Sequence, residues 1–223
     1  MVGFQVRQRE RAVSQQTVEK FSSLPVANIS DMMSRLQAAS AGLRPMHQGG
    51  VMAGPALTVR CRPGDNLMVH KALQMAQEGD VIVVDAGGDL TNAIIGELMV
   101  AKAIYRKLGG IVINGAVRDS ETIASGQFPV FALGVTHRGP YKDGPGEINV
   151  PICLGSMVIE PGDLIVGDAD GVVSVPFDLT EEVYQTTVKK HAQEEESLAM
   201  IQSGTDDTSW VDERLKSLGC KFV

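Results

Sequence analysis

The sequence contains no long apolar run and few cysteines. No uninterrupted apolar stretch approaches the roughly 20 residues of a membrane-spanning helix, and the first residues, MVGFQVRQRER, lack the apolar core of a secretory signal. We therefore expect a soluble cytoplasmic protein without membrane contact. The three cysteines, Cys61, Cys153 and Cys220, are odd in number and far apart, which fits a reducing compartment and argues against a disulfide framework.

A basic block is also absent. Twenty lysines and arginines stand against 27 aspartates and glutamates, so that the formal net charge is −7. A surface for the phosphate backbone of nucleic acids needs clustered positive charge, and we therefore expect no nucleic-acid partner. A local basic pocket stays compatible with this composition.

The chain is long enough for one sizeable core, because 43% of its 223 residues are hydrophobic. We predict a single domain over residues 1–223, with helical extensions at about 1–40 and 180–223. Short apolar strands alternate with helical patterns between these extensions, which favours an α/β fold.

The central pattern is a β-α-β unit. Residues 81–86, VIVVDA, form a continuous apolar run typical of a strand buried on both faces. A helix is predicted from about Gly96 to Leu108, with a stripe of Leu98, Ala101, Ile104 or Tyr105, and Leu108 facing the core, and the strand IVING follows at 110–114. In one sheet such a unit has a right-handed crossover.

Other elements are predicted on either side of this unit. Asn28 to Asp31 should cap a helix that runs to about Gln37, and a break at Gly54-Pro55 should interrupt the strand over 51–60. The rest are helices at 14–23, 66–77 and 180–201, a strand at 129–136, and short strands with hairpin turns from 150 to 176, one of them at GDADG, 167–171.

Arg118 and Asp119 follow the strand at 110–114 and its glycine-containing turn. The end of a strand in an α/β sheet is where ligand groups collect. Asp119 is a hard oxygen ligand suited to Mg²⁺, or to Mn²⁺, and the planar fork of Arg118 matches a carboxylate or an enolate oxygen. Alternatively, the pair is a strand-end salt bridge, with Asp119 capping a helix that starts near Glu121.

Gly96 and Glu97 precede Leu98 and Met99 at the predicted start of the helix in the β-α-β unit. If the helix begins here, the backbone N–H groups of Leu98 and Met99 are unpaired and favour an anion, such as the carboxylate of a 2-oxo acid. Alternatively, Leu98 and Met99 belong to a longer helix that starts at Asn92. In both cases their side chains are expected in the core.

Several motifs in order resemble the RraA family. They are Asp85 to Asp89, the Gly96-Glu97 pair, GGIVINGAVRDS, RGPYKDGPGEINVPI and VIEPGDLIVGDADGVVSVP, and they cover roughly residues 28–191. The family holds regulators of ribonuclease activity and class II pyruvate aldolases acting on 4-hydroxy-4-methyl-2-oxoglutarate and related acids. Its pattern of an acidic residue, twenty intervening residues and Arg-Asp is met by Glu97, Arg118 and Asp119.

The resemblance implies a compact mixed β-barrel flanked by helices, similar to the swivelling phosphohistidine domains and assembled as homotrimers or homohexamers. It also implies a divalent metal, usually Mg²⁺, held by Asp119. Arg118 would stabilise the pyruvate enolate formed when the C3–C4 bond of a 4-hydroxy-2-oxo acid breaks, and Glu97 would position a water at the metal for proton transfer. Oxaloacetate decarboxylation passes through the same enolate.

The family's aldolases carry aspartate where this chain has Glu97, and glutamate is typical of the regulator branch. The resemblance thus leaves a second function open, the inhibitory binding of a ribonuclease E-type protein. A methyltransferase, a label also attached to such proteins, is disfavoured because no glycine-rich cofactor fingerprint with an acidic ribose partner follows the first strand.

Additional polar residues are weaker candidates. Asp89 and Asn66 are read first as turn or cap residues, and His70 as an ordinary helix residue. The loop that carries His137, Arg138 and Lys142 could bind the distal carboxylate of a dicarboxylic substrate, although solvated loop charges are the default.

Overall fold

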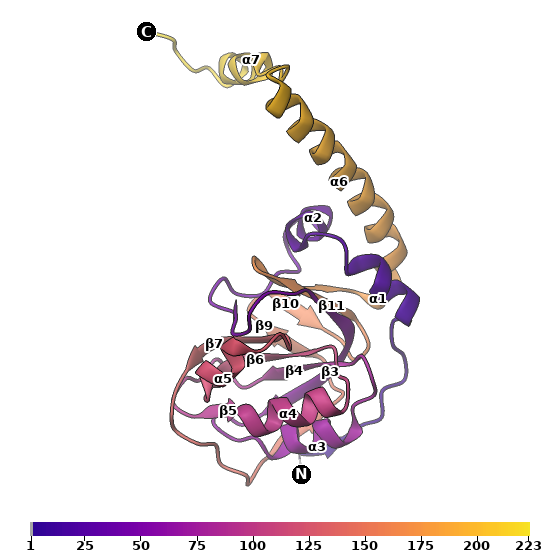
Figure 1. The fold of residues 1–223 in the computed structure, drawn as a ribbon, viewed down its shortest axis with the longest axis vertical. Coiled ribbons are helices and arrows are strands. Elements are labelled where there is room, and N and C mark those ends of the chain that lie inside the picture. Colours follow the sequence, from indigo (N-terminus) through magenta and orange to yellow (C-terminus); the bar gives the residue numbers. More distant parts are fainter. Residues whose placement is uncertain (1) are drawn as a thin grey trace. The chain divides into compact units, whose positions relative to one another are not determined.

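The computed structural model describes residues 2–223. Within them a ten-stranded mixed sheet follows the main path β1-β8-β3-β4-β6-β7-β2, with β5, β11 and β12 attached, and β9 and β10 form a separate pair (Figure 1). The strands are β1 Gln5–Val6, β2 Arg44–Pro45, β3 Met52–Cys61, β4 Val81–Asp85, β5 Ala93–Ile95, β6 Gly110–Val117, β7 Val130–Val135, β8 Gly146–Ile148, β9 Ile152–Leu154, β10 Met157–Ile159, β11 Leu164–Asp168 and β12 Gly171–Val175.

Seven α-helices and one 3₁₀ turn occur among the described residues. The helices are α1 Gln15–Phe21, α2 Val26–Met32, α3 Leu67–Met75, α4 Glu97–Tyr105, α5 Ser120–Ser125, α6 Thr180–Ser203 and α7 Ser209–Ser217, and the 3₁₀ turn is η1 Phe177–Leu179. The fold is therefore mixed α/β with a large sheet flanked by helices, as predicted. The strand pairings of residues 2–223 form an open path, so the closure of a barrel is not confirmed.

The β-α-β unit forms as predicted. Strands β4 and β6 pair in parallel, with Val81 opposite Gly110 and Asp85 opposite Asn114. Successive side chains of β4 point to opposite faces: Val81 and Val83 join the apolar cluster that includes β9 and β10, whereas Ile82 and Val84 join the cluster under α3 and α4. The strand is buried on both faces, which explains its unbroken apolar sequence.

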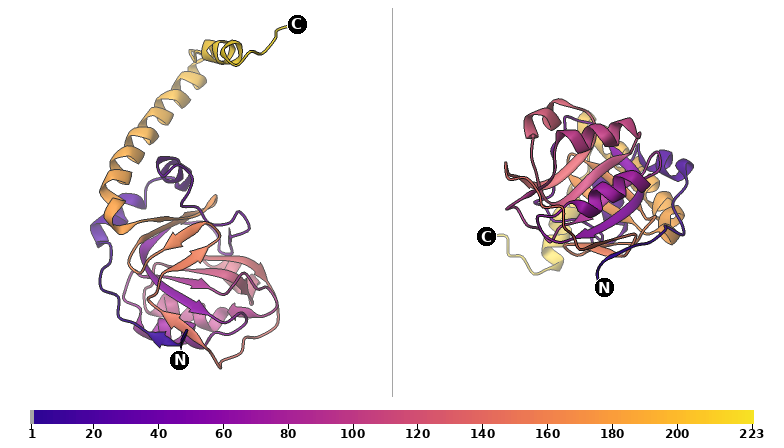
Figure 2. Two further views of the ribbon diagram at one scale, coloured as in Figure 1. Left: turned by 180° about the vertical axis from the view of Figure 1, so that it is seen from behind. Right: turned by 90° about the horizontal axis from the view of Figure 1, so that it is seen from below.

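Helices α3 and α4 cover one face of the sheet side by side (Figure 2, right). The face of α4 that packs downward differs from the predicted stripe. Met99, Val100 and Ala103 are buried, whereas Leu98 and Tyr105 are 73% and 89% exposed. The prediction that Leu98 lies in the core is therefore wrong. Two apolar stripes run along this helix, and its rotation about its own axis decides which of them faces the sheet.

Strand β3 does not stop at Gly54-Pro55 but changes partners there. Its first residues pair with β11 in antiparallel orientation, and from Ala56 it pairs with β4 in parallel. A Cβ on Gly54 would collide with the carbonyl oxygen of Gly79. The Gly-Pro pair thus marks the point at which one strand joins two parts of the sheet.

The boundaries of α2 also differ from the prediction. Asn28 to Asp31 lie inside the helix, which starts at Val26 and ends at Met32. Its first N–H, that of Val26, donates to Asp168 Oδ2 at 2.9 Å, so the cap comes from a distant strand end. Ser34 and Arg35 have positive φ angles, and the helix therefore cannot continue to Gln37.

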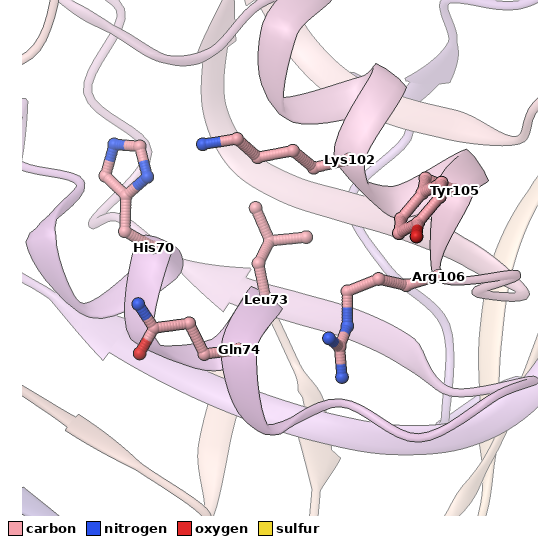
Figure 3. A pocket seen from close by; sticks show the side chains of 6 residues that line it. All are labelled: His70, Leu73, Gln74, Lys102, Tyr105 and Arg106. Carbon is pink, nitrogen blue, oxygen red and sulfur yellow. The ribbon is translucent and has the colours of Figure 1, made fainter.

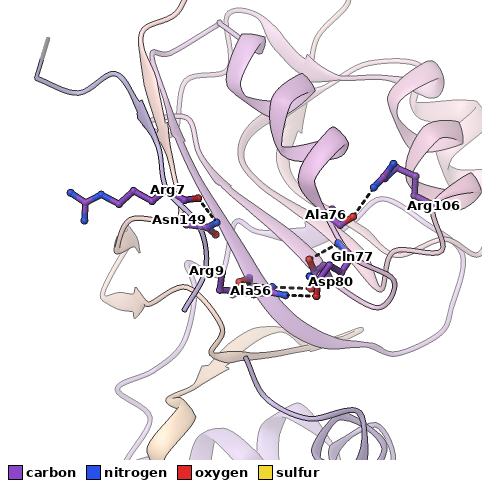
Figure 4. A network of polar contacts seen from close by, with 8 residues as sticks. All are labelled: Arg7, Arg9, Ala56, Ala76, Gln77, Asp80, Arg106 and Asn149. Carbon is purple, nitrogen blue, oxygen red and sulfur yellow. Dashed lines mark hydrogen bonds and ion pairs between the residues drawn. The ribbon is translucent and has the colours of Figure 1, made fainter. Parts of the chain in front are cut away.

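A polar network attaches the N-terminal segment to the sheet (Figure 4). Arg9 Nη1 donates to Asp80 Oδ1 at 2.8 Å, and the other oxygen of this buried carboxylate accepts the N–H of Gln77 at 2.8 Å. Asn149 Nδ2 donates to the carbonyl of Arg7 at 2.9 Å. Both contacts pair buried polar groups that would otherwise cost stability.

The chain divides into two compact units, of which the first ends at Thr187 and the second comprises Val188–Val223. The second unit contains the later turns of α6 and the helix α7. Its apolar side chains Leu198, Ile201 and Trp210 are largely exposed. No helix among residues 2–223 combines the length and apolarity needed to cross a bilayer.

Candidate functional site

Arg118 and Asp119 leave the end of β6 in a turn that aims their side chains at the start of α4. The N–H of Arg118 donates to the carbonyl of Ile95 at 3.0 Å and so joins β6 to β5. Asp119 then adopts a φ of 55° in the left-handed region, which aspartate tolerates better than most residues. The backbone of the site is thereby fixed by the sheet.

Asp119 stands at the N-cap position of α5 but does not cap that helix with its side chain. Instead, its Oδ2 accepts the backbone N–H of Glu97, the first residue of α4, at 2.9 Å. The Nε of Arg118 lies 3.6 Å from the same oxygen. The alternative interpretation of a simple strand-end ion pair and local cap is therefore wrong about the cap, and the carboxylate ties two elements together.

Gly96 makes this contact sterically possible. A Cβ at this position would collide with Asp119 Oδ2 and would lie 2.9 Å from Arg118 Cγ. The φ of Gly96 is −151°, an ordinary extended value. Glycine is needed here because of the close approach and not because of backbone conformation.

The start of α4 offers one free backbone donor and not the two that were predicted. The N–H of Met99 donates to the carbonyl of Gly96 at 3.0 Å, and the N–H of Glu97 is occupied by Asp119. Within residues 2–223, no acceptor pairs with the N–H of Leu98. An anion at this helix end would thus meet a single N–H together with the positive end of the helix dipole.

Two cavities meet at Arg118 and Asp119. The first, of about 240 Å³, is lined by these two residues together with Asn66, His70, Ile94, Ile95, Gly96, Leu98, Met99, Lys102, Gly139, Pro140 and Lys142. The second, of about 460 Å³, is lined by them together with Glu97, Ser120, Glu121, Thr122, Val135, Thr136 and His137. All six predicted site residues line one cavity or the other.

Asn66 is a site residue that the sequence indicated only weakly. It is 2% exposed, and its Nδ2 donates to the carbonyl of Ile94 at 2.9 Å. Its Oδ1 is buried without a hydrogen-bond partner among the described residues. Asp65 caps α3, because its Oδ1 accepts the N–H of Leu67 at 3.0 Å. The side chain of Asn66 is therefore not needed as a cap and lines the first cavity.

The remaining candidate residues differ in whether they line one of the two cavities. Asp89 lines neither cavity and holds its own turn through Thr91, whose hydrogen bonds lower the pKa of this carboxyl. His137 lines the second cavity and Lys142 the first, whereas Arg138 lines neither. His70, which was expected to be an ordinary helix residue, lines the first cavity.

The oxygen donors near Asp119 suit a hard divalent cation that keeps most of its coordination for water and substrate. Asp119 Oδ1 and the carboxylate of Glu97 take part in no hydrogen bond within residues 2–223, and both side chains are exposed beside the second cavity. No group of three or more His, Cys, Asp or Glu side chains gathers around a metal position in the described chain. The donor set therefore fits Mg²⁺ or Mn²⁺ better than Zn²⁺.

The family described as Aldolase/RraA, or RraA-like, matches residues 26–174, which include all the site residues described above. The chain belongs to the RraA-like family. A protein of Halalkalibacterium halodurans with the name "Putative 4-hydroxy-4-methyl-2-oxoglutarate aldolase" is 42% identical over 178 residues, which are 80% of this chain and 85% of the relative.

Solved structures of RraA proteins share the fold. RraAS2 of Streptomyces coelicolor, described as an unusual member of the RNase ES inhibitor RraA protein family, superposes with a TM-score of 0.76 at 25% identity and covers 84% of this chain and 98% of its own. The RNA-processing inhibitor RraA of Thermus thermophilus gives a TM-score of 0.63 at 30% identity and covers 68% and 92%. The RraA-like fold thus accounts for the sheet and for the helices that flank it.

Proposed function

We propose that this protein is a divalent-metal-dependent lyase that cleaves a 4-hydroxy-2-oxo acid, such as 4-hydroxy-4-methyl-2-oxoglutarate, to pyruvate. The observation that carries the proposal is the convergence of Arg118, Asp119 and the free N–H of Leu98 on one cavity. These residues supply a guanidinium cation, a metal-binding carboxylate and an anion-binding N–H, which are the groups that a 2-oxo acid and its enolate require. The name of the 42% identical relative supports the same chemistry.

The reaction is a retro-aldol cleavage. The C4 hydroxyl loses its proton, the C3–C4 bond breaks, and the C4 oxygen becomes the carbonyl oxygen of the second product. The electron pair of the broken bond forms the enolate of pyruvate, which then takes a proton at C3. Decarboxylation of oxaloacetate gives the same enolate with carbon dioxide as the leaving group, and we propose it as a side activity.

Each residue has a separate part in this reaction. The guanidinium of Arg118, half-exposed in the cavity wall, holds the negative charge that develops on the enolate oxygen. The N–H of Leu98 and the start of α4 bind the substrate carboxylate. Asp119 would hold Mg²⁺, or Mn²⁺, through Oδ1, while Oδ2 stays fixed by the N–H of Glu97. When bound, the cation would polarise the 2-oxo group.

The side chain of Glu97 is the proton-transfer group in this proposal. It is exposed, lines the second cavity beside Asp119, and makes no hydrogen bond to any residue of the described chain. A carboxylate that is not tied to a neighbour can accept the C4 hydroxyl proton, directly or through a water, and can return it to C3.

A second candidate function is the binding of a ribonuclease. Two structural relatives are described as an RNA-processing inhibitor and as an unusual member of the RNase ES inhibitor RraA protein family. The exposed apolar side chains of Leu98, Ile104 and Tyr105 on α4 offer a surface for a protein partner.

The same surface supports assembly into a homotrimer or homohexamer, which we also propose. Large apolar side chains gathered on one helix are unusual on a monomer. Sedimentation velocity would give a single species of three or six chains, and Tyr105→Lys would shift it toward smaller species. A monomeric wild-type protein would contradict the assembly.

The deciding experiment follows pyruvate release with metal-free protein. Oxaloacetate or 4-hydroxy-4-methyl-2-oxoglutarate is supplied, and Mg²⁺ is then added. We expect release only after Mg²⁺ addition and its loss in Arg118→Ala and Asp119→Ala. Arg138→Ala, a loop arginine outside both cavities, serves as the matched control and should keep full activity. Absence of metal-dependent release in the wild type would leave ribonuclease binding as the better candidate.

A further inference from the structure

The loop over residues 139–145, which leads into β8, forms part of the wall of the first cavity. Its residues Gly139, Pro140 and Lys142 line this cavity. The loop also reaches the reaction centre, because a Cβ on Gly139 would lie 3.1 Å from Nη1 of Arg118. The position of the loop therefore sets the shape of the cavity beside the guanidinium of Arg118.

This loop has little packing of its own. Four of its seven residues are glycine or proline, and Gly144 is the one buried residue among them. The helical walls of the cavity differ, since His70 and Lys102 extend from α3 and α4 (Figure 3), which pack on the sheet. A segment with few buried apolar contacts opens easily, so contacts from elsewhere must hold the loop.

Hydrogen bonds hold the backbone of the loop at both ends. The N–H groups of Asp143 and Gly144 donate to Oδ2 of the fully buried Asp65 at 2.7 and 2.9 Å. At the other end, Asn92 Nδ2 donates to the carbonyl of Gly139 at 2.6 Å. Such bonds are strongest where water is kept away from them. The end at Gly144 therefore depends on what covers it.

The N-terminal segment supplies this cover. A Cβ on Gly144 would meet Phe4 Cε2 at 3.3 Å and Leu67 Cδ2 at 3.8 Å. The ring of Phe4 thus packs on the backbone of a glycine that has no side chain to fill the space. With the ring in place, Gly144 is buried and Asp65 is fully buried. Phe4 therefore helps to keep water from the hydrogen bonds that fix this end of the loop.

The same segment also extends the sheet where the loop ends. Strand β1 pairs in parallel with β8, with Gln5 opposite Glu147, and without β1 the strand β8 would be the edge of the main path. Gln5 Nε2 donates to Oε1 of Glu147 at 2.5 Å, and Arg60 pairs with Oε2. Glu147 is 3% exposed, so loss of Gln5 would leave a buried oxygen without its partner, which is costly.

We infer that Phe4 and Gln5 are positioning residues, and that residues 4–6 form a strap that holds the loop 139–145 in the position that substrate binding requires. The inference rests on the proposed function and extends it to residues that line neither cavity. Loss of the strap should loosen one wall and weaken binding. Arg118 and Asp119 are held by β5 and by the start of α4, so the chemical step should persist.

Hydrogen–deuterium exchange tests the strap without a substrate. In Phe4→Ala and Gln5→Ala, peptides that cover 139–145 should exchange about tenfold faster than in the wild type, which corresponds to ~1.4 kcal/mol. Peptides of β4 and β6 should keep their rates. Val2→Ala is the matched control, because Val2 is an apolar residue of the same segment with a fully exposed side chain, and it should exchange like the wild type.

Pyruvate release adds a readout that a merely structural role would not move. KM for 4-hydroxy-4-methyl-2-oxoglutarate should rise about tenfold in Phe4→Ala, with little change in kcat. Phe4→Leu keeps an apolar side chain over Gly144 and should restore most of the wild-type KM. A protein that was only less stable would contain fewer active molecules, so its apparent kcat would fall at an unchanged KM.

The two measurements separate the strap from the lyase function. Unchanged exchange of 139–145 in both alanine variants overturns the strap, whether or not the protein releases pyruvate. Faster exchange with an unchanged KM would show that substrate binding does not need the held loop, and it would overturn the positioning role alone. A wild type that releases no pyruvate contradicts the proposed function, and the positioning role fails with it.

Discussion

Asp119 Oδ2 and the backbone nitrogen of Glu97 are joined by a hydrogen bond of 2.9 Å. This contact connects the end of β6 to the start of α4, and it leaves both the second oxygen of Asp119 and the whole side chain of Glu97 available. The backbone N–H of Glu97 and Oδ2 of Asp119 thus have a structural role, whereas the Glu97 carboxylate and Asp119 Oδ1 stay available for chemistry. The side chain of Glu97 can therefore be changed without loss of this contact, whereas that of Asp119 cannot.

Gly96→Ala should disable the site while preserving the fold. The new Cβ would displace Asp119 and Arg118, and because misplacement of catalytic groups by about 1 Å costs roughly a hundredfold in rate, we expect a loss of pyruvate release of that size. Circular dichroism should stay that of the wild type. Gly126→Ala is the control, since its Cβ would meet its nearest atom at an ordinary 3.5 Å. Equal activity of Gly96→Ala and wild type would contradict the tight contact.

Glu97→Gln should lower kcat and leave KM nearly unchanged. The hydrogen bond to Asp119 uses the backbone of Glu97 and survives the substitution, but the amide cannot accept a proton. General acid–base groups contribute about 10²- to 10⁴-fold, so kcat should fall at least about a hundredfold.

Glu97→Asp tests the length of the same side chain. It keeps the carboxylate, and we expect it to retain most of the turnover because a carboxylate can still accept the proton. Steady-state kinetics of the two variants side by side are the measurement. Full kcat in Glu97→Gln would exclude a proton-transfer role for this residue.

The pKa of His70 should rise when Lys102 is replaced by methionine. Burial is the largest cause of the lowered pKa of His70, and the charges of Lys102 and Lys142 lower this pKa further. Removing one cation should therefore bring the pKa part of the way back toward its ordinary value of 6.5. The unfolded chain binds the proton more readily, and this histidine therefore makes stability increase with pH through the window just below 6.5.

The measurement is an NMR titration of the histidine ring signals, with His70→Gln used for assignment among the four histidines. Urea unfolding at several pH values checks the stability change. An unchanged His70 titration in Lys102→Met would show that the two side chains do not interact.

Cys61 should be inert in the folded protein. Burial, assisted by the charges of Asp65 and Asp85, raises the pKa of its thiol to about 12, so that almost no thiolate exists at pH 8. Cys153 and Cys220 are exposed. Iodoacetamide followed by peptide mass spectrometry should therefore label these two in the native state and Cys61 only in denaturant. Native labelling of Cys61 at a similar rate would contradict its burial.

Local patterns predicted the elements on which the site depends. The apolar run of 81–86 and the glycine-bounded helix and strand that follow it became β4, α4 and β6, because their lengths and end signals leave few alternatives. Arg118 and Asp119 stand at the end of β6 for the same reason. Elements held by distant contacts were predicted less well, such as α2, whose cap comes from Asp168.

The partners of individual groups depended on the packing of elements that are distant in sequence. The exposure of Leu98, the pairing of the Met99 N–H and the unpaired Oδ1 of Asn66 all depend on how α4 and α3 rest on the sheet. Lys102 and Lys142 are forty residues apart and share a cavity wall because Asp65 anchors the loop of Lys142 to α3.

The sequence by itself determined which residues are available for chemistry and which strand end carries them, because side-chain type and apolar periodicity are local properties. The tertiary structure decided what each of them touches. If α4 were rotated about its own axis until its other apolar stripe faced the sheet, a different set of side chains would be exposed. Only the packing of α4 against the sheet fixes that rotation.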